Sequence, residues 1–136
     1  MKALTLSLIA PLFLAFAAPA FSGQDTQVQQ VFLCEFNNDD ATNDKLLELS
    51  AEWLKAARMT KGGENTNVVV RFPIAEGNNV EYDFAFVVVT PSFTEWGVFT
   101  DAYEDSEVAK VDEKFRKLAD CTGSTLWEAM LIKVAD

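Results

Sequence analysis

Four charged residues interrupt otherwise apolar, extended stretches of the chain: Glu35, Arg71, Asp83 and Glu128. Each lies near the middle of a segment expected to be a strand, and simple alternation assigns all four to one side of a sheet. Because buried charges need partners, one interpretation is a structural ion network in which two carboxylates clamp Arg71. In the other, one carboxylate stays incompletely paired in a semi-enclosed cavity and acts as an acid or base, or binds a cationic ligand.

Large aromatic residues offer a second kind of site. Trp53, Trp96, Trp127 and Tyr103 could line a pocket for a flat apolar ligand, although aromatic residues at helical spacing are more often packed in a core. Trp96 and Tyr103 are the stronger binding candidates, because they belong to a short helix expected at a strand end, where clefts tend to open. Trp53 is the third candidate.

The composition excludes several classes of function. The chain has no histidine, so the ordinary catalytic triad of a protease or esterase is excluded. No glycine-rich phosphate loop or dinucleotide fingerprint occurs. The run from Asn37 to Asp40 lacks calcium-loop spacing, so we expect a turn there, and we expect neither a metal nor a cofactor. A formal net charge of -10 argues against binding to nucleic acid or to anionic membranes.

The N-terminal residues are typical of a secretory signal peptide. One lysine precedes an apolar run that ends at Ala18, and small residues follow. Cleavage fits after Ala20 or, preferably, after Ser22, so that residues 1–22 are the signal. Residues 23–136 would then form a single periplasmic or secreted domain. A retained membrane anchor is the alternative, but the run is short for a helix that spans a bilayer.

The chain contains two cysteines, Cys34 and Cys121. In an oxidising compartment we expect them to form a disulfide. Two buried free thiols are the alternative. A catalytic thiol is disfavoured, because no histidine can serve as its base.

Periodicity predicts seven elements in the order strand, helix, strand, strand, short helix, helix, strand. The strands are expected at residues 31–36, 67–75, 80–90 and 124–134, and the helices at 43–59, 92–103 and 107–120. Ser92 and Glu95 form a capping box, and Gly97 would let the short helix approach a neighbour closely. Asp112 and Arg116 are spaced for an ion pair on the outer face of the last helix.

That order matches the ferredoxin-like split βαβ plan, an α+β fold with a four-stranded antiparallel sheet and helices on one face. Right-handed crossovers lead us to expect the first and third strands side by side and parallel, with the last strand antiparallel beside the first. The helix-covered face should hold Phe32, Cys34, Phe36, Tyr82, Phe84, Phe86 and Trp127. The opposite face should hold a mostly apolar set: Val31, Leu33, Glu35, Val69, Arg71, Asp83, Ala85, Val87, Val89, Glu128, Met130 and Ile132.

This second face is too apolar to be left in water, and a second copy of the sheet is its simplest cover. The chain thereby resembles the dimeric α+β barrel superfamily, which includes antibiotic-biosynthesis-type monooxygenases and NIPSNAP-like proteins. The resemblance rests on the element order from about Val31 to Val134 and on a strand followed by the capped aromatic helix PSFTEWGVF. It implies a homodimer joined through its sheets, with a ligand cavity between sheet and helices or inside the barrel. Members with haem or metal chemistry often use histidine, which this chain lacks.

The leading hypothesis is an exported dimer that binds a small apolar or cationic molecule, or that serves as an accessory module. The first alternative is a cofactor-independent oxygenase or isomerase acting on a flat apolar substrate, and the second is a structural envelope protein. A cavity of several hundred Å³ with an unpaired carboxylate would favour the enzyme. A filled core with Arg71 fully paired would favour the accessory module.

Overall fold

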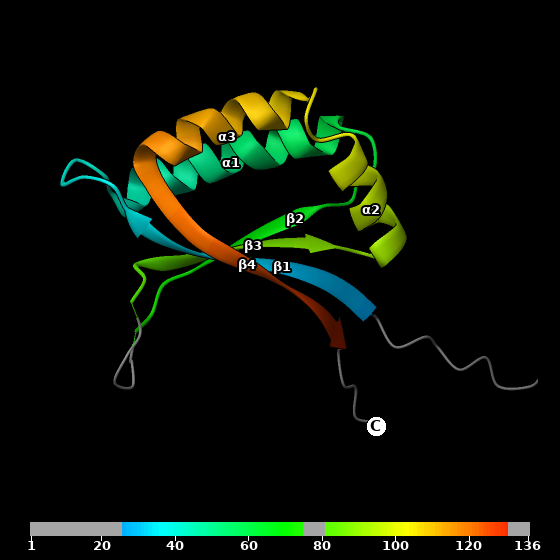
Figure 1. Ribbon diagram of the computed structural model, residues 1–136, viewed down its shortest axis with the longest axis horizontal. Coiled ribbons are helices and arrows are strands. Elements are labelled where there is room, and N and C mark those ends of the chain that lie inside the picture. The colour runs from blue at the N-terminus through cyan, green and yellow to red at the C-terminus, as the bar shows by residue number, and fades with distance from the viewer. Residues whose placement is uncertain (1–25, 75–80, 131–136) are drawn as a thin grey trace, which may run out of the picture.

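The computed structural model describes residues 26–74 and 81–130, which form one antiparallel sheet covered on one face by helices (Figure 1). The elements are β1 (Thr26–Phe36), α1 (Asn43–Met59), β2 (Asn67–Arg71), β3 (Phe84–Thr90), α2 (Phe93–Asp101), α3 (Glu107–Leu118) and β4 (Ala119–Met130). The predicted α+β fold and the order of its elements are confirmed. The proposed signal peptide lies outside the described residues. Within them, no helix is both long enough and apolar enough to cross a membrane.

The strands lie in the order β2-β3-β1-β4, and each neighbouring pair is antiparallel. The expectation that the first and third strands run parallel is therefore wrong. β1 and β2 point the same way across the α1 crossover, but the chain reverses after β2 and inserts β3 between them. β2 is an edge strand, in agreement with Pro73 just beyond its end.

Several boundaries differ from those that periodicity predicts. β1 begins at Thr26, because its first residues pair with β4 and, from Val28 onward, also with β3. β2 stops at Arg71, before Pro73. At the other end of the domain, α3 passes directly into β4 at Ala119, so this strand begins earlier than residue 124.

Tyr82 and Asp83 precede β3 instead of belonging to it. The carboxylate of Asp83 accepts a hydrogen bond of 2.7 Å from the backbone N–H of Phe36. The ladder pairs of β3 begin at Phe84, so the two-residue period does not extend back to Tyr82. Tyr82, predicted on the helix-covered face, instead packs on the opposite face, against Ala85, Val87 and Val89.

A β-bulge changes the register between β1 and β4. On one side of it, Cys34 pairs with Cys121. On the other side, Phe32 pairs with Ser124, so β4 contains one residue more than β1 between these pairs. Gly123 lies in this interval with a φ of 139°, a conformation that favours glycine. The interval was predicted to follow a helix end, and it lies inside a strand.

The bulge exchanges the faces of the residues that follow it. Trp127 pairs with Gln29, on the face away from the helices, and Glu128 pairs with Val28, on the helix side. Simple alternation predicts the opposite for both residues. One extra residue in a strand turns every later side chain over, which explains the error.

The core lies between the sheet and the helices. Phe84, Phe86 and Val88 of β3 point toward the helices, where they join a buried cluster that includes Leu46, Trp53, Phe99, Val108, Val111 and Phe115. The ring of Trp53 stands edge-on to that of Phe86, with centroids 5.3 Å apart. The opposite face of the sheet, called the open face below, carries the smaller cluster around Val87.

One of the two bonds of the predicted capping box starts α2, whereas the Glu95 carboxylate binds the hydroxyl of Ser92 and not its backbone N–H. The N–H of Glu95 donates to the hydroxyl oxygen of Ser92 at 3.2 Å, and that hydroxyl donates to the Glu95 carboxylate at 3.1 Å. Close approach to α2 occurs at Gly62, not at Gly97. A Cβ on Gly62 would lie 2.5 Å from the backbone nitrogen of Phe99, whereas a Cβ on Gly97 would have no atom within 4 Å. The loop after α1 therefore fixes the position of α2.

Candidate functional site

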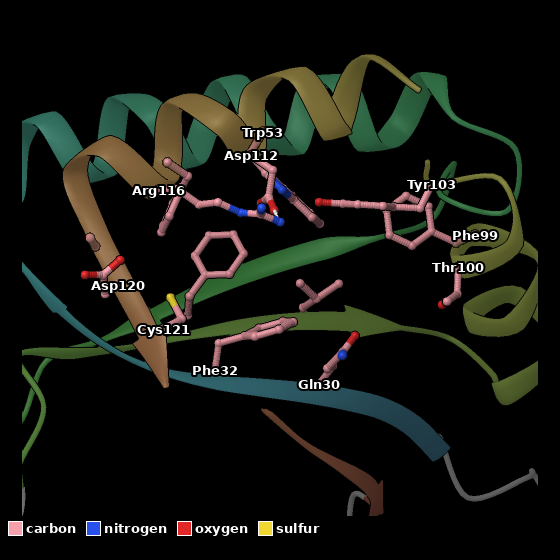
Figure 2. Close-up of a pocket in the computed structure, with 14 residues that line it drawn as sticks. Gln30, Phe32, Trp53, Phe99, Thr100, Tyr103, Asp112, Arg116, Asp120 and Cys121 are labelled. Atoms are coloured by element: carbon pink, nitrogen blue, oxygen red, sulfur yellow. Dashed lines mark ion pairs between the residues drawn. The ribbon is translucent and has the colours of Figure 1, made fainter. Parts of the chain in front are cut away.

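A cavity of about 470 Å³ lies between the helix-covered face of the sheet and the helices (Figure 2). All three helices contribute to its walls, as do β1, β3 and the first residues of β4. Its volume is in the range of small-molecule sites in proteins. Most of its apolar wall consists of ring side chains and one valine, namely Phe32, Trp53, Phe86, Val88, Phe99 and Phe115.

The rings meet edge to face rather than filling the space. Trp53 from α1 contacts Phe86 of β3 and also Phe99 of α2, with centroids 6.1 Å apart in the second pair. Phe115 of α3 contacts Phe86 at 5.0 Å. Each ring is set by the helical or strand period of its own element, so an aromatic wall forms where the three elements converge.

Tyr103, Asp112 and Arg116 form a polar end of the cavity. Figure 2 shows the Tyr103 hydroxyl and the Arg116 guanidinium converging on Asp112 beneath α3. Arg116 lies 3.5 Å from Asp112, one helical turn away. Burial raises the pKa of Tyr103 well above its ordinary value, and its hydrogen bond to Asp112 and the charge of Asp112 raise it further, while Arg116 acts in the opposite direction. The phenol therefore stays protonated at physiological pH and serves as a hydrogen-bond donor.

Gln30 of β1 connects the cavity wall to two other elements. Its side-chain oxygen accepts a hydrogen bond from the indole N–H of Trp96 at 3.2 Å. Its amide group donates to the hydroxyl of Ser124 at 3.4 Å. Trp96 itself does not line the cavity, so its part is to hold Gln30 and α2 in place.

The structure brings two of the three predicted ligand-binding residues into one cavity. Trp53 and Tyr103 both line it, and Trp96 supports it from outside. Trp127 lies far from this arrangement on the open face, where it is 59% exposed and its N–H donates to Thr125 at 2.7 Å.

The four charged strand residues do not come together. Arg71 reaches across the open face to the side-chain oxygen of Gln29 at 3.3 Å. Asp83 binds the backbone at the end of β1, Glu35 lies opposite Asp120 on the ladder, and Glu128 faces the other side of the sheet. All four are exposed, and the ion pairs found among residues 26–74 and 81–130 include none of them. The expected common network on one face is wrong.

Sequence reasoning missed most of the polar lining. Asp112 and Arg116 do pair as their spacing predicts, but they border the cavity, whereas the prediction placed them on the outer face. A signal was present, because Asp112 directly follows the core residue Val111 and lies three residues before Phe115. Gln30 and Thr100 carried no comparable signal.

No protein-family model matches the chain, and no curated protein matches it. Among solved structures, a hypothetical protein of Arabidopsis thaliana has a TM-score of 0.50 and 14% identity, covering 85% of this chain and 96% of that one. The sheet order and the crossovers match the split βαβ plan, and this structural similarity agrees with that plan. The chain has the ferredoxin-like fold.

Two further ferredoxin-like structures are similar to this chain. A dimeric protein of unknown function from Thermobifida fusca has a TM-score of 0.47 and 16% identity, covering 79% of this chain and 93% of its own. A DABB family protein from Mesorhizobium loti has a TM-score of 0.48 and 12% identity, covering 81% and 99%. Identities this low describe the ferredoxin-like fold alone, so the function has to be argued from the cavity.

Proposed function

We propose that this protein is an exported homodimer that binds a small, flat and largely apolar molecule in the cavity between its sheet and helices. The observation that carries the proposal is the cavity itself, about 470 Å³ of space walled by aromatic rings and closed at one end by polar groups. A ligand that fits such a wall leaves water and packs against ring faces, and both effects favour binding.

The polar end would fix the orientation of the ligand. Asp112 lies beside Tyr103 and pairs with Arg116, so the opposite charges at this end offset each other. A few placed polar groups in an apolar pocket are the usual source of specificity in small-molecule sites.

The state of Tyr103 favours binding over proton abstraction by this residue. An oxygenase or isomerase acting in the cavity would need a group that takes a proton from its substrate. Because the raised pKa of Tyr103 keeps its phenol protonated, Tyr103 is suited to donating a hydrogen bond and poorly suited to acting as a base.

The disulfide between Cys34 and Cys121 supports export. Structural disulfides persist mainly in oxidising compartments. Together with the signal-like N-terminal residues, this favours the periplasm or the cell exterior.

The open face supports the homodimer. Leu33, Val69 and Trp127 are 41%, 42% and 59% exposed there, around the buried Val87. These residues come from β1, β2 and β4, so the apolar surface extends across the sheet. A second copy of the same face would cover it.

Ligand binding can be tested by equilibrium dialysis with 2-isopropenylnaphthalene, a flat hydrocarbon small enough for the cavity. Thr100→Phe adds a ring to the cavity wall from α2, and we expect it to weaken binding by about tenfold or more. Thr94→Phe is the matched control, because Thr94 is exposed on the same helix and does not line the cavity. Equal binding by the two variants, or no uptake by the wild-type protein, would contradict the proposal.

A further inference from the structure

We infer that Trp53 selects ligands that carry a neutral hydrogen-bond acceptor, such as the carbonyl oxygen of an aromatic ketone, which would bind its indole N–H. The inference rests on the proposed function and adds the chemical class of the ligand.

Within the described residues, the indole N–H of Trp53 is a donor without an acceptor. Trp53 is only 4% exposed. The corresponding groups of Trp96 and Trp127 donate to Gln30 and Thr125. Among residues 26–74 and 81–130, no hydrogen bond is made by the N–H of Trp53. Buried polar groups normally have a partner in the protein or in water, so a ligand could take the place of water at this donor.

This N–H is not sealed within the core. In the described part of the chain, the side-chain polar atoms that lack both a partner and any accessible surface are the hydroxyls of Thr66 and Thr90. The indole nitrogen of Trp53, which has no partner among the described residues, does not belong to this group, so it retains accessible surface. Because Trp53 lines the cavity, we take this surface to face the space that a ligand would fill. A bound molecule can therefore supply the missing acceptor.

The surroundings select a neutral acceptor. A cationic ammonium has no lone pair with which to accept a hydrogen bond. A carboxylate could accept, but the net charge of -10 repels anions, and the guanidinium of Arg116 is already paired with Asp112. A carbonyl oxygen on a ring system satisfies the donor and keeps the flat shape that the aromatic wall favours.

The test compares 2-acetylnaphthalene with 2-isopropenylnaphthalene, which differ only in the replacement of C=O by C=CH₂. We expect wild-type protein to prefer the ketone by about five- to tenfold, the usual effect of one net hydrogen bond. Trp53→Phe removes the N–H but keeps a ring, and it should abolish or reverse this preference, because the bound carbonyl then has no donor in place of water. Trp127→Phe is the matched control, because Trp127 lies on the open face away from the cavity, where its N–H donates to Thr125, and it should retain the preference.

The outcomes distinguish a failure of the inference from a failure of the proposed function. Equal binding of ketone and hydrocarbon by wild type would overturn the inference and leave the proposed function standing. Binding of neither probe would overturn both. A ketone preference that persists in Trp53→Phe would mean that another group donates to the carbonyl oxygen, and it would overturn the inference.

A second measurement does not depend on the folding of Trp53→Phe. The chain has three tryptophans, so the indole N–H resonance of Trp53 can be assigned in wild-type protein from spectra of Trp96→Phe and Trp127→Phe. The ketone should shift this resonance downfield and the hydrocarbon should not. Similar shifts with both probes would count against the inference.

Discussion

Cys34 on β1 lies directly opposite Cys121 on β4, and a disulfide joins the two across the sheet ladder. Cys34 is buried in the core, whereas Cys121 borders the cavity. α3 ends at Leu118 and runs into β4 without a loop, so the bond also holds the end of α3 against the sheet. The disulfide thus fixes one wall of the candidate site.

Removal of the disulfide should destabilise the protein substantially. The two cysteines lie 87 positions apart in the sequence, so the cross-link restricts a long loop of the unfolded chain. We expect Cys34→Ala combined with Cys121→Ser to lower the free energy of unfolding by about 2 to 4 kcal/mol, measured by urea denaturation. Wild-type protein treated with a reductant should lose a similar amount. An unchanged urea midpoint in both samples would show that the bond contributes nothing to stability.

Gly62 should be intolerant of a side chain. Its φ is 82°, and a Cβ there would lie 2.5 Å from the backbone of Phe99 on α2. We expect Gly62→Ala to cost about 2 kcal/mol or more and to weaken ligand binding by displacing α2. Gly97→Ala is the control, because that position is helical and open, and it should stabilise the protein by about 0.5 to 1 kcal/mol. Thermal unfolding curves with the same loss for both variants would refute the expectation.

A charge on the open face should prevent dimerisation. We expect Leu33→Glu to weaken self-association by about tenfold or more, since each copy would bury an unpaired carboxylate in the interface. Sedimentation velocity over a range of concentrations measures this. Leu47→Glu makes the same change on α1, where the leucine is 49% exposed and away from the sheet, and it should leave the dimer intact. A wild-type protein that stays monomeric at high concentration would remove the proposed dimer.

Tyr103 should make stability depend on pH in alkaline solution. Its pKa is raised in the folded state above the ordinary value of 10.0, so the unfolded chain loses this proton first. The free energy of unfolding therefore does not change with the titration of Tyr103 below pH 10.0, and it falls as the pH rises further. Tyr103→Phe should show a shallower fall, which isolates this residue from Tyr82 and the lysines. Urea unfolding at a series of pH values measures both slopes, and parallel curves would be inconsistent with a raised pKa.

Features that depend on neighbouring residues were predictable from the sequence. The capping box of Ser92 and Glu95 needs only two side chains three positions apart. The inward face of β3 follows from the alternation of Phe84, Phe86 and Val88. The cysteine pairing follows from there being two cysteines in a chain that carries a signal-like N-terminus.

Features that depend on distant pairing were decided only by the tertiary structure. The extra residue of β4 near Gly123 cannot be recognised from the alternation of residue types, yet it places Trp127 on the open face and Glu128 on the helix side. The residues around Asp112 would look the same in the sequence whether it lay on an outer helix face or beside a cavity. Only the packing of α2 and α3 over the sheet places it beside Tyr103. Local propensity and periodicity are properties of contiguous residues, so the chain by itself determined its elements and their order. Register and enclosed space arise from contacts between residues far apart in sequence, so the fold alone decided where the site lies.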